Sequence, residues 1–582
     1  MLKTDVLITG SEGAGARAAI AASEHGADVI VATKGRIGKS GATITAIAAL
    51  AVGGQGIREV LNLPGHPEDT PEVFFEDIIT EGKYINNQKL VGQVVDEGPF
   101  RMKELMDWGM QSTASDLPIP GHRFPRDIDT TGRQMVKALK KKIQQCRNIR
   151  IIEDLMITDL LKEDGRVIGA VGIDLCKGDF IVILAKAVIL STGGAQTVYP
   201  VTTAPEELTG DGQAMAYRAG ADLIDMEMVQ FRPCNFIWPP IWKGIGFPFT
   251  IGPGGGIQAT WLLNKWGERF MSKWDPERME NTTRDISSIA IMTEVIEGRG
   301  SPHGGAFLSL AHLPYNLIDN FGKWFLPGIV SPNWHFVGFN FAGLVEDIKK
   351  GYAMEVGPAC HFFMGGIRID EHCRTTVEGL YAIGEVAGGT NGANRLSGVA
   401  LTQIFVQGAN GGEAAAFYAK KQKDITVDAQ QIKKLEEKIT QPLLRDKGAN
   451  PFEVRKSIQD LAWQKVGVVR TGASLLEAQD EIRRMKGEDL PNLSCRAKER
   501  EYNREWVEAI QIENLLTTLE CIARSALERK ESRGAHFRKD YPEMDNNNWL
   551  INTVLHNRQG EMALSRVPVV VTRFTPPGKG EN

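Results

Sequence analysis

The chain has 582 residues, 42% of them hydrophobic and 24% charged, and its formal net charge is −5. One hydrophobic core seldom organises so long a chain, so we expect two to four domains. The net charge argues against a nucleic-acid-binding protein, and no apolar run reaches the roughly 20 residues that span a bilayer, so we expect no membrane-spanning helix.

The N-terminal residues predict a strand, a glycine turn, a helix and a second strand. Residues 5–9 and 27–33 are short apolar runs, and an alanine-rich stretch lies between them. The turn after the first run contains Gly10, Gly13, Ala14 and Gly15. In such a unit the glycines let the backbone approach a pyrophosphate, and the helix N-terminus offers it unpaired N–H groups. We therefore predict a dinucleotide site over residues 13–16.

Two residues bear on this prediction. Glu12 stands where the dinucleotide fingerprint has its second glycine, and an anionic side chain is unexpected beside phosphate. The alternative is that the turn opens an ordinary α/β helix and binds nothing. Lys34 follows the second strand at a position where NAD enzymes often have an acidic ribose ligand, so a nicotinamide cofactor is disfavoured.

Two later apolar strands, 185–190 and 380–383, also end in turns that contain glycine. These turns include Thr192, Gly193, Gly384 and Glu385. Ligands of doubly wound sheets collect at the carboxyl ends of strands, so three such ends indicate one extended dinucleotide. FAD fits that description better than a mononucleotide.

The rest of the chain predicts three further parts. Residues 235–352 are rich in Trp, Pro, Gly and Phe and lack strand–helix alternation, which indicates an inserted cap. Helical periodicity begins near residue 427, and helices are expected over 430–439, 454–468, 475–485 and 504–530. The tail is rich in turn residues and ends in a strand-like stretch, 568–574.

We therefore predict an α/β fold with a Rossmann-like FAD-binding domain, an inserted α+β capping domain and a C-terminal helical bundle. The expected bounds are 1–234 with 353–424 for the FAD-binding domain, 235–352 for the cap, 425–535 for the helical domain and 536–582 for the tail. The cap would pack over the flavin domain.

Seven motifs, spread along nearly the whole chain, resemble those of one known family. They are Thr209–Gly212, Met226–Phe231, Gly267–Met271, Arg284–Asp285, His361–Ile367, Gly392–Leu396 and Glu531–His536. Their joint order resembles the flavoprotein subunits of succinate dehydrogenase and fumarate reductase, a family that includes L-aspartate oxidase and the adenylylsulfate reductase alpha subunit. The resemblance implies an FAD-dependent oxidoreductase that acts on the CH–CH bond of a small dicarboxylate.

The same resemblance implies roles for individual residues. Arg284 would supply or remove the substrate proton, and His361 and Arg395 would clamp a substrate carboxylate, which a guanidinium can bind through two hydrogen bonds. The FAD-binding residues would be Gly10, Gly13, Ala14, Gly15, Lys34, Ser40, Gly41, Thr192, Gly193, Asp211, Glu385, Arg395, Ala400 and Leu401. No metal ligands are expected.

The sequence departs from the family in the substrate site. Thr250 is retained, but Ile251 stands where the family has a relaying glutamate, and Arg232 replaces the histidine of a Gln-Phe-His-Pro motif. Thr250 and Arg232 therefore join the candidate catalytic residues. Either fumarate or succinate is held by rearranged contacts, or the substrate is a different anion, because unpaired buried polar groups change which substrate is accepted.

A further departure concerns the attachment of FAD. Respiratory members of the family tether it to a histidine in a Ser-His-Thr segment. Residues 39–46 of this chain, Lys-Ser-Gly-Ala-Thr-Ile-Thr-Ala, contain no histidine. We therefore predict non-covalent FAD.

The seven cysteines are scattered, which excludes an iron–sulfur cluster within the chain, because such a cluster needs about four cysteines brought together. The preferred interpretation is a fumarate reductase or succinate dehydrogenase flavoprotein subunit that works with a separate iron–sulfur subunit. No targeting signal is recognisable, so we expect a cytoplasmic protein, either free or held at the inner face of the membrane through other subunits.

Two alternatives stay open. One is a sibling FAD enzyme, either L-aspartate oxidase, an adenylylsulfate reductase alpha subunit or a reductase of another unsaturated acid. The other is a flavin-binding subunit without catalytic activity, for which Glu12 and Ile251 are the evidence.

Overall fold

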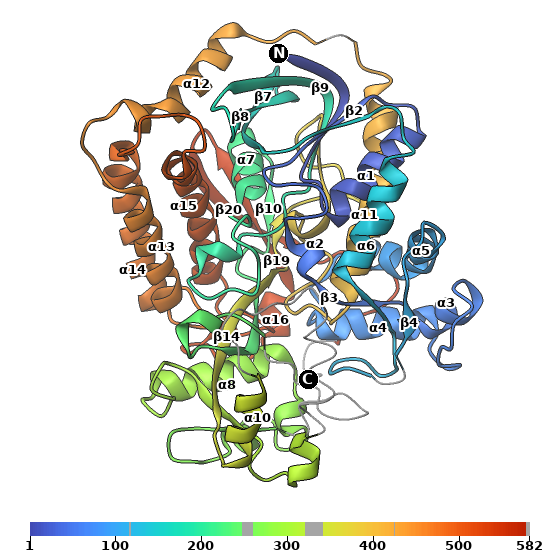
Figure 1. Cartoon of the computed structure of the whole chain (residues 1–582), viewed down its shortest axis with the longest axis vertical. Coiled ribbons are helices and arrows are strands. Elements are labelled where there is room, and N and C mark those ends of the chain that lie inside the picture. Colours follow the sequence, from blue (N-terminus) through green and yellow to red (C-terminus); the bar gives the residue numbers. More distant parts are fainter. Residues whose placement is uncertain (116–117, 247–259, 320–340, 424, 578–582) are drawn as a thin grey trace.

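The computed structural model describes residues 1–115, 118–246, 260–319, 341–423 and 425–577 (Figure 1). In these ranges a seven-stranded sheet has the order β6–β2–β1–β9–β8–β7, and β16 also pairs with β9. The strands are β1 (Leu2–Thr9), β2 (Val29–Ala32), β6 (Ile149–Ile152), β7 (Leu155–Glu163), β8 (Arg166–Asp174), β9 (Phe180–Leu190) and β16 (Leu380–Ala382). Strands β6, β2, β1, β9 and β16 run parallel, which confirms the predicted Rossmann-like sheet.

Helices α1 (Gly13–Glu24) and α11 (Val399–Ala419) pack against each other beside this sheet. Glycines of α11 allow the close approach, because a Cβ at Gly408 would lie 2.8 Å from the carbonyl oxygen of Ala14. The contact brings the start of α11 to the glycine turn. The other elements of this part are α2 (Ala42–Thr45), α3 (Gly54–Glu59), α4 (Pro71–Glu81), α5 (Gln88–Asp107), α6 (Gly132–Ile143), α7 (Asp211–Ala219), β3 (Ile47–Ala51), β4 (Thr113–Ala114) and β5 (Asp127–Thr131).

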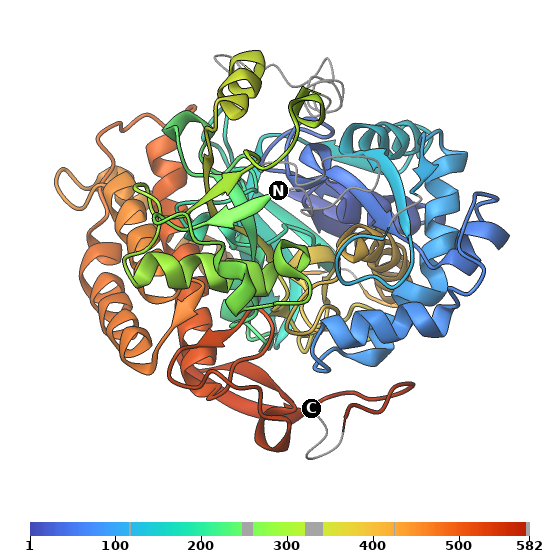
Figure 2. The ribbon, with the colours of Figure 1, turned by 90° about the horizontal axis from the view of Figure 1, so that it is seen from below.

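A second, antiparallel sheet of order β11–β14–β13–β12 lies at the lower end of the molecule in Figure 1. Its strands are β11 (Val229–Phe236), β12 (Trp261–Leu263), β13 (Ala306–Ser309) and β14 (Met354–Phe363), and α8 (Arg284–Ile296) and α10 (Phe341–Lys349) belong to the same part, which we call the cap. Seen from below, the cap lies in front of the central sheet (Figure 2). The predicted α+β cap is confirmed, and the exact domain bounds stay a prediction.

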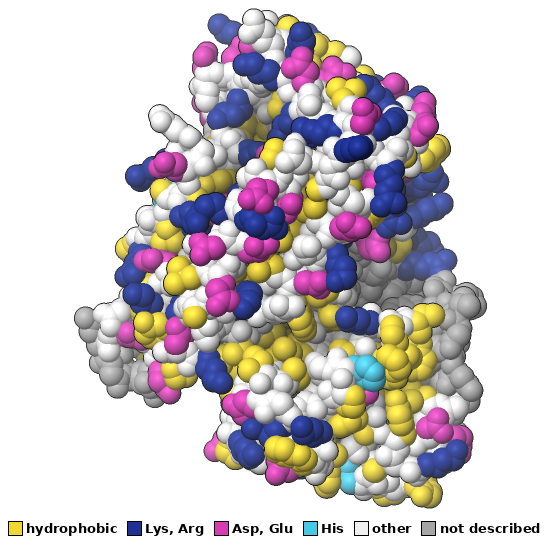
Figure 3. Space-filling view, turned by 90° about the vertical axis from the view of Figure 1, so that its left-hand side faces the viewer, with side chains coloured by type: hydrophobic (Ala, Val, Ile, Leu, Met, Phe, Trp, Pro, Cys, Tyr) yellow, Lys and Arg dark blue, Asp and Glu magenta, His cyan; other side chains and the backbone are white. Residues whose placement is uncertain are grey.

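A helical part follows, at the left in Figure 1. It consists of α12 (Ala429–Leu444), α13 (Pro451–Lys465), α14 (Gly472–Arg484) and α15 (Arg504–Glu528), each of which overlaps one predicted helix, with ends that differ by up to five residues. Helix α15 is largely buried, because apolar residues such as Ile512 and Leu519 pack in one core with those of α13 and α14. Over most of the face drawn in Figure 3, basic and acidic side chains are interspersed.

The tail returns to the FAD-binding part. Strands β19 (Ile551–Arg558) and β20 (Glu561–Pro568) extend a sheet with β10 (Leu223–Ile224) and β15 (Gly366–Ile367). The remaining elements are β17 (Val469–Arg470), β18 (Phe537–Arg538) and α16 (Asn546–Trp549).

The strand expected over 568–574 is wrong, because β20 ends at Pro568. The segment after it lies against α5 instead. The Gln88 side chain accepts hydrogen bonds from the backbone N–H groups of Thr572, Arg573 and Phe574 at 2.8–3.0 Å. These N–H groups therefore need no neighbouring strand. No local sequence pattern reveals this contact with Gln88.

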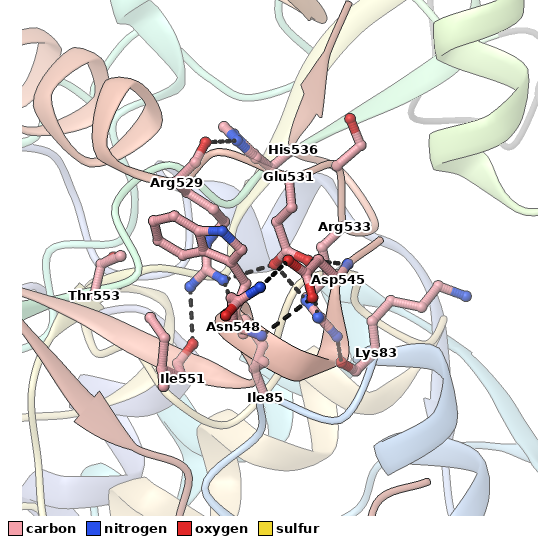
Figure 4. A network of polar contacts seen from close by, with 12 residues as sticks. Lys83, Ile85, Arg529, Glu531, Arg533, His536, Asp545, Asn548, Ile551 and Thr553 are labelled. Atoms are coloured by element: carbon pink, nitrogen blue, oxygen red, sulfur yellow. Dashed lines mark hydrogen bonds and ion pairs between the residues drawn. The ribbon is translucent and has the colours of Figure 1, made fainter. Parts of the chain in front are cut away.

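A buried ion-pair network connects the end of α15 to the FAD-binding part (Figure 4). Glu531 accepts hydrogen bonds from Arg529 Nη1 at 2.8 Å and from Arg533 Nε at 2.7 Å. Arg529 also donates to Glu227 at 2.7 Å, and Arg533 donates to the carbonyl oxygen of Lys83 at 2.8 Å. The side chains of Arg529, Glu531 and Arg533 are out of contact with water, so each depends on the others to offset its charge.

We expect Glu531→Ala to lower the free energy of unfolding by about 3–5 kcal/mol, because it leaves two guanidiniums buried without their shared carboxylate. Urea unfolding followed by circular dichroism measures the loss. Glu477→Ala is the matched control, since Glu477 pairs with Lys465 at the surface, where such pairs contribute less than about 1 kcal/mol. Equal effects of the two substitutions would contradict a stabilising role for the network.

Candidate functional site

The glycine turn lies where β1, β9 and α1 meet. Gly10 has a φ of +104°, a conformation that favours glycine, and a Cβ at Gly15 would clash with the Gly10 carbonyl oxygen. The strand register places Thr9 beside Leu190 and Leu190 beside Ala382. The turns after β1, β9 and β16 therefore adjoin one another near the N-terminus of α1, an end of a helix that favours anions.

Several buried polar atoms around these turns have no hydrogen-bond partner among the described residues. They are both carboxyl oxygens of Glu12, Thr192 Oγ1, Gln196 Oε1 and Gln213 Oε1. Thr192 Oγ1 lies so close to Gly212 that a Cβ at this glycine would clash with the hydroxyl. Buried polar groups are nearly always hydrogen-bonded in a complete protein, so this set fits a ligand with hydroxyl and phosphate groups, as FAD has.

Lys34 and Asp211, both predicted from the sequence, form an ion pair. Lys34 Nζ lies 2.8 Å from Asp211 Oδ2 and 2.9 Å from the Thr209 hydroxyl. Asn514 of α15 donates to Asp211 Oδ1 at 2.9 Å, so the helical part helps to fix this pair. Ser40 closes the turn after β2, where its hydroxyl accepts a hydrogen bond from the backbone N–H of Arg36 at 2.8 Å.

Glu385 lies just past β16 and faces the turn after β9. Burial raises the pKa of its carboxyl to about 7, and hydrogen bonds from the Phe363 N–H, at 3.0 Å, and from the Gln196 amide act against that rise. A Cβ at Gly194 would lie 2.6 Å from Glu385 Oε1. The segment that contains Gly193 and Gly194 is thus in contact with Glu385.

Ala400 and Leu401 belong to the first turn of α11. The side chain of Ile404, one turn later, occupies the space that a Cβ at Gly13 would need. The predicted cofactor residues thus border one region around the glycine turn, although their separate roles stay a prediction.

Four candidate catalytic side chains lie near one another, Arg395 buried and the other three half-buried. Arg232 comes from β11, Arg284 is the first residue of α8, His361 comes from β14, and Arg395 comes from the loop before α11. Gln230 of β11 bridges two of them, since its Oε1 accepts hydrogen bonds from Arg284 Nη1 and Arg395 Nε, each at 3.2 Å. The cap therefore supplies three of the four groups.

Burial and mutual repulsion lower the pKa values in this cluster. Burial, then the charges of Arg284, Arg395 and Arg232, holds the pKa of His361 well below its usual range. Burial, then Arg284, lowers the pKa of Arg395 strongly and that of Arg232 to about 10. Guanidiniums that face one another in a buried place are stable only with anions beside them. The arrangement is suited to binding an anion.

Two buried carboxyls interact with Arg284, and sequence analysis did not single them out. Burial lowers the pKa of Arg284, whereas Glu81 at the end of α4 and Asp127 at the start of β5 raise it. Burial raises the pKa of each of these carboxyls to about 7. In the sequence, Asp127 is only one of two aspartates that flank Ile128, a pattern that does not indicate a functional site.

Ser397 and His122 were also missed. The Ser397 hydroxyl accepts a hydrogen bond from Arg284 Nη2 at 3.2 Å, and its carbonyl oxygen lies 3.0 Å from His122 Nε2. Burial lowers the pKa of His122 to about 4, so the ring is neutral and Nε2 can donate to that carbonyl. Ser397 follows the Gly392–Leu396 motif directly, which was the available signal. Thr250 and Ile251 lie outside the described residues.

The parallel sheet, the glycine turn at the ends of its strands and the unpaired polar atoms around that turn are typical of proteins that bind a dinucleotide. Residues 5–401 match the model of the FAD binding domain, and residues 455–581 match that of the fumarate reductase flavoprotein C-terminus. In Methanothermobacter marburgensis, one subunit of fumarate reductase (CoM/CoB) is 38% identical over 93% of this chain and 95% of its own length.

Two further comparisons agree. The fumarate reductase flavoprotein subunit of Mycobacterium tuberculosis is 32% identical over 99% of this chain and 98% of its own. The structure of E. coli quinol fumarate reductase with a mutation in FrdA superposes with a TM-score of 0.87 at 28% identity, covering 100% of this chain and 99% of that one.

The chain belongs to the family of fumarate reductase and succinate dehydrogenase flavoprotein subunits. It is an FAD-dependent oxidoreductase that acts on CH–CH bonds, so the family resemblance and the FAD cofactor inferred from the sequence are confirmed. Within the described ranges, no helix has the length and apolar character needed to cross a membrane.

Proposed function

We propose that this chain is the catalytic flavoprotein subunit of a fumarate reductase or succinate dehydrogenase-type enzyme, with fumarate or succinate as its substrate. The cluster of Arg232, Arg284, His361 and Arg395 carries the proposal, because it offers several donors to a small dianion. The M. marburgensis relative, whose name is fumarate reductase, supports the same substrate.

Each residue of the cluster has a distinct task in this proposal. FAD, when bound, supplies or accepts the electron pair as a hydride. Arg395 and His361 hold one substrate carboxylate and so orient the carbon–carbon bond, which is a large share of such catalysis. Arg284 supplies or removes the proton: burial lowers its pKa, and Gln230 and Ser397 fix its two terminal nitrogens.

We also propose that electrons travel through a separate iron–sulfur subunit. The seven cysteines are free thiols, five of them are buried, and burial raises the pKa of each of these five well above the ordinary thiol value, so they suit packing better than cluster ligation. The relatives are named as subunits, which supports a multisubunit enzyme. Such partners would hold the chain at the inner face of the membrane.

A different unsaturated carboxylate is the second candidate substrate. Arg232 favours it, because a guanidinium that faces Arg284 adds positive charge where the family pattern has a histidine. Reoxidation of the dithionite-reduced protein by fumarate, by iminosuccinate formed from aspartate, by adenylylsulfate and by other unsaturated acids would select the substrate. Fumarate as the poorest oxidant of the panel would overturn the first proposal.

We expect Arg284→Leu to slow reoxidation of the reduced flavin by fumarate at least about 100-fold, because the proton donor is lost. Stopped-flow absorbance measures the rate, and the FAD content should be unchanged. Arg483→Leu on the surface of α14 is the matched control. Reoxidation of Arg284→Leu at the original rate would refute the assignment of Arg284 as proton donor.

We expect Gln230→Glu to raise the KM for fumarate about tenfold or more, because a carboxylate between Arg284 and Arg395 would compete with that of the substrate. Gln230→Leu removes the same hydrogen bonds without adding charge, so its KM should rise less. Steady-state rates with a reduced viologen dye measure both. Equal effects would mean that charge competition is not the cause.

We expect acid precipitation to release FAD into the supernatant, because residues 39–46 offer no histidine for covalent attachment. Absorbance spectra of the pellet and the supernatant measure the distribution. A yellow pellet and a colourless supernatant would show a covalent bond formed elsewhere in the chain.

A further inference from the structure

Glu12 lies at the N-terminus of α1, where the dinucleotide fingerprint has a glycine. Its two carboxyl oxygens are shielded from water, and neither has a hydrogen-bond partner among the described residues. The carboxyl lies against Gly41, since a Cβ at that glycine would be 2.6 Å from Glu12 Cδ and 3.0 Å from Oε1. Glu12 is thus held between the start of α1 and the start of α2, at the edge of the cofactor region.

The surroundings of Glu12 favour its neutral form. Burial raises the pKa of the carboxyl to about 7, and the negative charge of Glu207 adds to the effect. The backbone N–H groups of Thr43 and Ile44 and the Thr43 hydroxyl lie near the carboxyl and act in the opposite direction, but none of them has the geometry of a full hydrogen bond and together they do not offset burial. Beside a pyrophosphate, a carboxylate would repel the ligand, whereas a carboxylic acid can donate a hydrogen bond to a phosphate oxygen.

We propose that Glu12, as a carboxylic acid, donates a hydrogen bond to the pyrophosphate of FAD, so that FAD binding takes up a proton. In the usual fingerprint a glycine lets phosphate approach the backbone, and here a side chain supplies a contact instead. The ionised fraction of Glu12 in the apoprotein acquires its proton from solvent as FAD binds. This proposal requires an FAD-binding protein and is independent of the substrate and of the role of Arg284.

A purely structural role of Glu12 would require its ionised form. An ionised Glu12 could accept hydrogen bonds from the N–H groups of Thr43 and Ile44 and so cap α2, whose N-cap residue has no side chain. A cap requires the carboxylate, whereas the pyrophosphate contact requires the acid. The pH dependence of FAD binding therefore separates the two roles.

The test is the dissociation constant of FAD from the full-length protein at pH 6, 7 and 8, measured by quenching of flavin fluorescence. The neutral fraction of a carboxyl with a pKa near 7 falls about tenfold from pH 6 to pH 8, so we expect the wild-type Kd, divided by that of Glu12→Gln, to rise about tenfold. Gln stays neutral and donates at every pH. The ratio removes the contribution of Glu385, whose pKa is also about 7.

Glu24→Gln, at the other end of α1, is the matched control and should keep the wild-type dependence on pH. Glu12→Gly restores the fingerprint glycine and, like Glu12→Gln, should lose the dependence that Glu12 causes. A ratio that stays constant from pH 6 to pH 8, with a less stable apoprotein in Glu12→Gln, would identify a cap and overturn the proposal.

Infrared spectroscopy of the holoprotein gives an independent readout that needs no removal of FAD. At pH 8 we expect the carbonyl stretch of a protonated carboxyl that is present in the wild type and lost in Glu12→Gln. If the wild-type spectrum minus the Glu12→Gln spectrum shows no such band, Glu12 is ionised in the complex and the proposal is wrong.

Discussion

The repulsion among the guanidiniums of Arg232, Arg284 and Arg395, which also lowers the pKa of the neighbouring His361, constrains the rest of the site. In a medium of low dielectric such groups can stay together only if acceptors and anions surround them. Gln230 shares one oxygen between two guanidiniums. A bound dianion would neutralise the remaining positive charge of the cluster. The same charge would therefore attract the substrate and be stabilised by it.

This constraint explains why acidic groups lie around the cluster. Glu385 offsets part of the charge of Arg395, and Glu81 and Asp127 do so for Arg284. Burial raises the pKa of each of these three carboxyls to about 7, so their charge is itself sensitive to the ligand. The same principle applies to Glu12 on the cofactor side, where burial favours a neutral acid. In both proposals, the charge of a buried acid depends on whether an anionic ligand is bound beside it.

The scaffold makes the cluster possible by joining distant segments. The cap strand β11 carries Gln230 and Arg232, and Glu227, just before it, is tied to Arg529 at the end of the helical part. Asn514 of α15 reaches Asp211 in the same way on the cofactor side. The helical part and the tail thus hold both the cap and the cofactor region, although neither contributes a predicted catalytic residue.

The amino-acid sequence alone determined the fold class, the FAD cofactor, the family and the long helices, because these depend on local signals: apolar periodicity, glycines in turns and ordered motifs. Only the tertiary structure revealed that Asp127, Glu81 and His122 lie close enough to Arg284 to interact with its charge. It also revealed that Gln88 binds the backbone of the segment that was expected to form a strand over 568–574. These contacts join residues far apart in the chain, and the charge state of a buried group depends on its neighbours in space. A sequence shows which groups can ionise, whereas packing decides which of them face one another.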